Sequence, residues 1–110
     1  MNEFETRLKQ HQESKDVEAL ANVLVDMLKT QLPNTTVYRK GKWFYINHGR
    51  VFGTGTKYSS FRVAKDDGWV CMTQSKRRMF CLLTSSYTIV LQNVRRKLEL
   101  IKTGMTVFGI

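Results

Sequence analysis

Hydrophobic residues near the start of the chain repeat every three or four positions, which is the period of an α-helix. The clearest such stripe consists of Val17, Leu20, Leu24, either Met27 or Leu28, and either Gln31 or Leu32. It predicts an amphipathic helix over residues 17–32, with Asp16 as its N-cap and Pro33 as its stop. A weaker pattern predicts a short helix over residues 2–12. A flexible arm over residues 1–15, or one long helix, is the alternative.

From Thr35 the hydrophobic period changes to two, which is typical of a strand with one buried face. Residues 35–39 and 42–47 flank Lys40-Gly41 and predict a β-hairpin with a two-residue turn. The alternation places Val37, Phe44 and Ile46 on one face, and Tyr38, Trp43 and Tyr45 on the other.

A second hairpin follows, because residues 58–64 and 69–74 alternate around a polar turn at residues 65–68. Its predicted apolar face consists of Phe61, Val63, Val70 and Met72. The turn Ser75–Arg78 leads into a further strand over residues 79–84. With that turn, Met72 lies opposite Cys81, so Cys81 points into the core and Cys71 points to the other face. The two cysteines are therefore predicted to be free thiols.

The last part of the chain returns to helical spacing, with a stripe of Tyr87, Leu91, Val94, Leu98 and Ile101. We expect a helix from Ser85 or Ser86 to about Lys102, closed by Gly104 as a cap. The apolar tail, residues 105–110, is expected to dock on the domain, as a short strand. The fold class is thus α+β: one two-layer domain over residues 1–110, with four to five antiparallel strands between an N-terminal and a C-terminal helix.

Composition narrows the class of protein. The 110 residues are 42% hydrophobic, which suits a single folded domain, and the longest apolar run, Met79–Leu83, is far too short to span a membrane. The N-terminus is charged and lacks a secretory leader. These features predict a cytoplasmic protein.

The positive charge is concentrated in the middle of the chain. Residues 39–78 contain ten Lys and Arg against two Asp, whereas residues 1–38 contain four against six. A segregated positive field favours a polyanionic partner, either nucleic acid or an acidic protein surface.

Signs of catalysis or metal binding are weak. The two histidines, His11 and His48, lie in no known ligand spacing, and the acidic pair Asp66-Asp67 suits a turn. The glycine-rich segment Gly53–Thr56 does not continue into a phosphate-binding motif. The sequence predicts a protein that is not an enzyme and that holds neither cofactor nor metal.

Basic and aromatic residues alternate between positions 38 and 50, a pattern that suits nucleic-acid binding. Lysine and arginine neutralise phosphates, and exposed aromatic rings stack on unpaired bases. The predicted contacts are Arg39, Lys40, Lys42, Trp43, Tyr45, Arg50, Lys57, Arg62, Lys76, Arg77 and Arg78. The alternative for the aromatic residues is that Trp43 and Trp69 are core residues under a helix.

The leading hypothesis is therefore a small basic protein that binds DNA or RNA with limited sequence specificity. The alternative is an inhibitor or regulator of the kind that phages and mobile elements encode, docking on an acidic partner. In that case a homodimer could form through a second apolar face that contains Cys71, Phe80 and Leu82, together with the apolar tail.

Overall fold

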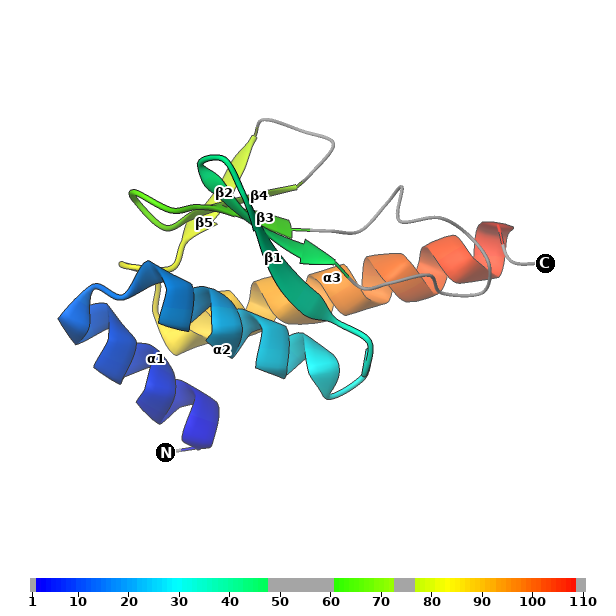
Figure 1. The fold of residues 1–110 in the computed structure, drawn as a ribbon. Coiled ribbons are helices and arrows are strands. Elements are labelled where there is room, and N and C mark those ends of the chain that lie inside the picture. Colours follow the sequence, from blue (N-terminus) through cyan, green and yellow to red (C-terminus); the bar gives the residue numbers. More distant parts are fainter. Residues whose placement is uncertain (1, 48–60, 73–76, 109–110) are drawn as a thin grey trace.

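A computed structural model describes residues 2–47, 61–72 and 77–108, with side chains up to Ile101 (Figure 1). The predicted α+β two-layer fold is confirmed: a five-stranded antiparallel sheet has its helices gathered on one side. The elements are α1 (Glu3–Ser14), α2 (Val17–Lys29), β1 (Thr36–Lys40), β2 (Trp43–Asn47), β3 (Phe61–Ala64), β4 (Trp69–Met72), β5 (Arg78–Cys81) and α3 (Tyr87–Phe108).

The N-terminal segment forms two helices rather than one. Lys15 ends α1 in the left-handed conformation, with φ at 54°, and the next residue, Asp16, is the N-cap of α2. The Asp16 carboxylate accepts a hydrogen bond from the Ala19 backbone N–H at 3.1 Å, as expected of an N-cap. This break allows α1 to turn back and pack against α2 through the buried Leu8.

The five strands are joined in sequence order, and each pairs with its chain neighbour. The turn of the first hairpin is Gly41-Lys42, one residue later than predicted, because Lys40 pairs with Trp43. Gly41 takes a φ of 57° there, a conformation that glycine adopts at little cost. The predicted faces of this hairpin are unchanged, since both registers place the same residues on the same side.

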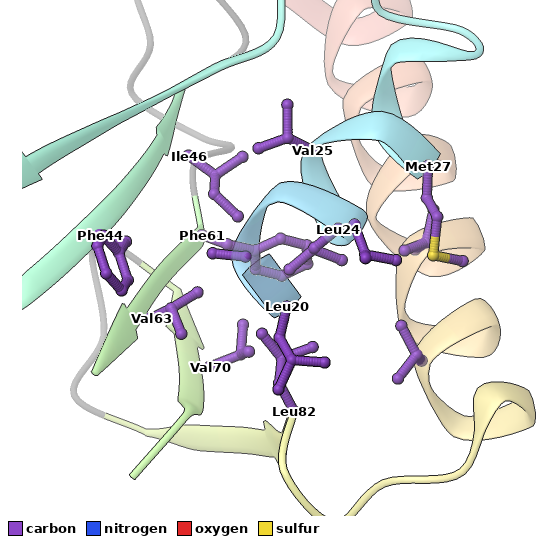
Figure 2. Packing of buried hydrophobic residues seen from close by; sticks show 14 of the residues in the cluster. Leu20, Leu24, Val25, Met27, Phe44, Ile46, Phe61, Val63, Val70 and Leu82 are labelled. Carbon is purple, nitrogen blue, oxygen red and sulfur yellow. The ribbon is translucent and has the colours of Figure 1, made fainter. Parts of the chain in front are cut away.

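The core lies between the sheet and the helices α2 and α3. Figure 2 shows Phe44, Ile46 and Phe61 pointing from the sheet toward Leu20 and Leu24 of α2. The apolar face predicted for the second hairpin is confirmed, since its strands pair in the expected register. All four residues of that face are buried or packed against the core cluster.

The predicted pairing of β5 is wrong. Cys81 lies opposite Trp69 rather than Met72, and a shift of three positions exchanges the two faces of a strand. Phe80 and Leu82, assigned above to a second apolar face, therefore belong to the core. Cys81 points away from the core, to the same side as Cys71, and both thiols are free and buried.

The β4–β5 pairing also contains a β-bulge, which changes the register by one position and so exchanges the faces of β5 on its two sides. Val70 pairs with Phe80, whereas the next residue of β4, Cys71, pairs with Arg78, so β5 holds one extra residue, Met79. A bulge re-aims the side chains beyond it. Here it places Arg78 on the side of the sheet away from the helices.

The last helix is longer than predicted. It continues through Gly104 to Phe108. The predicted cap at Gly104 is therefore wrong, and so is the predicted strand over residues 105–108. One glycine inside a helix costs only about 1 kcal/mol, which is too little to end a helix whose neighbours continue it. The final two residues of the tail lie outside the described part of the chain.

Candidate nucleic-acid interface

One face of the sheet points away from the helices, and we call it the outer face. Residues that lie directly opposite each other in antiparallel strands share a face, so the pairing identifies its members. They include Tyr38, Lys40, Trp43, Tyr45, Arg62, Trp69, Cys71, Arg78 and Cys81. None of these residues belongs to the main core cluster, and none of the described helices lies on this side (Figure 1).

Aromatic rings line the outer face at the β1–β2 end. The rings of Tyr38 and Tyr45 stack with centroids 5.2 Å apart and planes 12° from parallel. Tyr38 is 48% exposed, and Trp43, two residues before Tyr45 on β2, is half-buried. The alternative that Trp43 and Trp69 are core residues under a helix is therefore wrong. Both lie half-exposed on the opposite side of the sheet.

Each tryptophan of the outer face carries an arginine. The guanidinium carbon of Arg62 lies 4.3 Å from the ring centre of Trp43, and that of Arg78 lies 5.1 Å from the ring centre of Trp69. The positive charge is attracted to the electron-rich face of the indole, which holds the guanidinium over the ring. Cationic and aromatic surfaces are thus presented together.

These two pairs surround a groove of about 450 Å³, which we call the sheet groove. Cys71 forms part of its lining, and Ala64 and Asp67 border it. The Asp67 carboxylate accepts a hydrogen bond from the Trp69 backbone N–H at 3.1 Å, so it stabilises the β3–β4 turn. The Cys81 thiol donates a hydrogen bond to the Asp67 carbonyl oxygen at 3.2 Å and so stabilises the same turn.

The predicted basic contacts do not all lie together. Lys40 lies on the outer face, and Lys42 is exposed in the adjoining turn. Arg39 lies on the other side of β1, where it forms an ion pair with Glu18 of α2. Strand alternation separates Arg39 from its neighbour Lys40 in this way. Arg50, Lys57 and Lys76 lie outside the described residues.

A second groove, of about 380 Å³, lies at the β5 edge of the sheet beside α3, and we call it the edge groove. Arg78 lines both grooves, so the two are neighbours. The remaining lining residues are Met72, Arg77, Met79, Asn93, Arg96 and Leu100. Of the predicted contacts, Arg77 is thus placed at the edge rather than on the outer face.

The predicted contacts omit Tyr38, although the alternation of the first hairpin places it on the same face as Trp43 and Tyr45, and they omit Trp69, for which a core position was the alternative. Both residues lie on the outer face. The sequence patterns did not reveal the buried Lys97. That side chain is only 2% exposed, with its Nζ atom 3.2 Å from the Met72 sulfur and 4.8 Å from the Phe61 ring centre. Burial lowers the pKa of the Lys97 ammonium from 10.5 to about 7.

Within the described residues, no three His, Cys, Asp or Glu side chains cluster as a metal site would require. No helix in that part of the chain has the length and apolarity needed to cross a membrane. Comparison with protein-family models found no match, and comparisons with curated proteins and with solved structures found no significant similarity.

Proposed function

We propose that this protein binds single-stranded nucleic acid on the outer face, with limited sequence specificity and without catalysis. The observation that carries the proposal is the pair of arginine-covered tryptophans, Trp43 with Arg62 and Trp69 with Arg78, on a sheet face free of the described helices. Aromatic rings stack on unpaired bases of any sequence, and arginines bind the phosphates between them.

The geometry favours single strands over duplexes. A base can stack on Tyr38 or Trp43 only when the face of the base is uncovered. In an unpaired strand it is uncovered, whereas in a duplex the neighbouring base pairs cover it. An arginine stacked on an indole keeps its N–H groups in its own plane, so one side chain can contact the ring and a phosphate together. Such contacts read the backbone and the base faces, which carry little sequence information.

The charge distribution supports an anionic ligand on this side of the molecule. Six of the nine acidic residues lie within the first 26 positions, which form α1, α2 and the segment that joins them. These helices lie on the opposite side from the outer face (Figure 1). The resulting field steers a polyanion toward the sheet.

The direct test is a fluorescence titration. The chain contains two tryptophans, and both line the sheet groove, so intrinsic emission reports on this site. We expect an oligothymidine strand of twelve nucleotides, dT12, to quench the emission, and the affinity to fall steeply with salt. Polyglutamate of equal charge is the control, because it has charge but no bases.

The variants Arg78→Ala and Arg95→Ala provide a matched pair, since both remove one exposed arginine. Arg78 covers Trp69, whereas Arg95 lines a separate surface with Gln31, Leu98 and Glu99. Only Arg78→Ala should weaken binding. If dT12 does not quench emission, or if polyglutamate binds as tightly and quenches as much, the proposal is wrong. In the second case an acidic protein becomes the better candidate partner.

A further inference from the structure

We infer that a bound strand leaves the sheet over the β5 edge and runs into the edge groove, where Arg96 of α3 contacts its backbone. This inference rests on the proposed function, because it extends the same site. Arg78 lines both grooves and therefore marks the crossing point between them. The ligand of the edge groove would be the sugar–phosphate chain of a single-stranded nucleic acid.

The charge of the edge groove suits a phosphate chain. Three arginines, Arg77, Arg78 and Arg96, line it, and its described lining includes no carboxylate. Arg96 is exposed, and Asn93 one turn earlier on α3 adds an amide to the same wall. Arginine is suited to this role because its planar fork of N–H donors matches the oxygens of a phosphate.

The position of Arg96 is distinct from that of its neighbours on α3. Successive residues of a helix are about 100° apart around the axis. Arg95 therefore points to a separate surface shared with Glu99, and Lys97 points into the core. Among these three consecutive cations, Arg96 is the one that faces the edge groove.

The apolar lining of the edge groove suits the sugar part of the chain. Met72 and Met79 are half-buried there, and Leu100 is 55% exposed at the rim. Methionine side chains are flexible and polarisable, so they adapt to irregular apolar surfaces. The edge groove thus offers cationic groups to the phosphates of a strand and apolar groups to its sugars.

The dimensions of the sheet explain why a strand must leave it. Five strands at about 4.8 Å spacing span about 19 Å. At about 3.4 Å or more per nucleotide, this distance accommodates roughly six nucleotides at most. A strand of six nucleotides can therefore be satisfied by the outer face alone, whereas one of twelve nucleotides extends past the edge.

The experiment compares fluorescein-labelled dT6 and dT12 by anisotropy, on the wild-type protein and on Arg96→Ala and Arg95→Ala. We expect Arg96→Ala to weaken dT12 about fivefold and to lower the salt slope by about 0.7, while dT6 changes by less than about twofold. Arg95→Ala should leave both affinities close to the wild-type values. Arg96→Lys should retain most of the dT12 affinity, because the charge remains.

The outcomes separate the two proposals. If wild-type protein binds dT6 and dT12 but Arg96→Ala and Arg95→Ala behave alike, the edge groove is not part of the site, and the outer face remains. An equal loss on dT6 and dT12 also overturns the inference, since Arg96 would then act on the sheet site itself. If wild-type protein binds neither strand, the proposed function fails, and the inference fails with it.

Discussion

Lys97 offers the sharpest test of the packing between α3 and the sheet. Its side chain is 2% exposed and is enclosed by Met72 and Phe61, an environment in which an ammonium group loses most of its hydration. The substitution Lys97→Met keeps a long, flexible side chain and removes the charge. We expect this variant to be more stable than the wild-type protein.

The magnitude follows from the lowered pKa of Lys97. The difference between 10.5 and about 7 corresponds to about 5 kcal/mol, at about 1.36 kcal/mol per pKa unit, as an upper bound on the cost of burying the charge. Replacing buried charged groups with apolar side chains of similar size typically recovers about 1–4 kcal/mol. We therefore expect a gain of about 1–4 kcal/mol in the free energy of unfolding at pH 6.

The gain should depend on pH in a defined direction. Between pH 7 and pH 10.5 the unfolded chain holds a proton on Lys97 that the folded chain has released. The free energy of unfolding of the wild-type protein therefore increases as pH rises through that window. The advantage of Lys97→Met is largest at and below pH 7, and it shrinks toward pH 10.5.

Urea denaturation of the wild-type protein and Lys97→Met at pH 6, 7, 8 and 9 measures the difference in their free energies of unfolding. The titration of all other groups contributes equally to both proteins and therefore cancels in that difference. Lys29→Met is the control, since Lys29 is exposed at the end of α2 and should change stability by less than about 0.5 kcal/mol. The reasoning is refuted if Lys97→Met destabilises the protein at pH 6, or if its effect is the same at pH 6 and pH 9.

Three further predictions concern the outer face. Trp43→Ala should weaken dT12 binding by about 1–3 kcal/mol and leave the salt slope unchanged, because stacking releases no counterions; a changed slope in a salt titration would contradict this. Lys40→Ala should lower the salt slope on dT12 by about 0.7, whereas Arg39→Ala should not, because Arg39 is paired with α2 on the other side of the sheet. Cys71 and Cys81 should resist a thiol reagent in the native protein and both react after unfolding without reductant, so a count below two would indicate a disulfide.

The elements that sequence patterns predicted well are those in which one face is buried. In the β1–β2 hairpin, alternation alone separates Phe44 and Ile46 from Trp43 and Tyr45, and a turn placed one residue early does not disturb that division. The same signal indicates that Tyr38 shares the outer face. Face assignment is reliable here because the period of two is fixed by the geometry of the strand.

The features that escaped prediction depend on contacts between distant parts of the chain. Alternation does not reveal where a strand contains an extra residue, so the pairing of Cys81 could not be counted from the sequence. The burial of Lys97 has a similar cause. Its position fits the stripe of Val94 and Ile101, but a lysine there is ordinarily expected to reach solvent.

The bulge at Met79 connects the irregularity of the fold to the proposed site. In a regular strand, Arg78 would share a face with Phe80 and would point into the core between the sheet and the helices. The extra residue turns Arg78 to the outer face instead, where it covers Trp69 and borders both grooves. A buried, unpaired arginine would be costly, so the bulge and the position of this charge are consistent with each other. Arg78, which the extra residue Met79 turns to the outer face, thus supplies the contact by which the sheet groove and the edge groove adjoin.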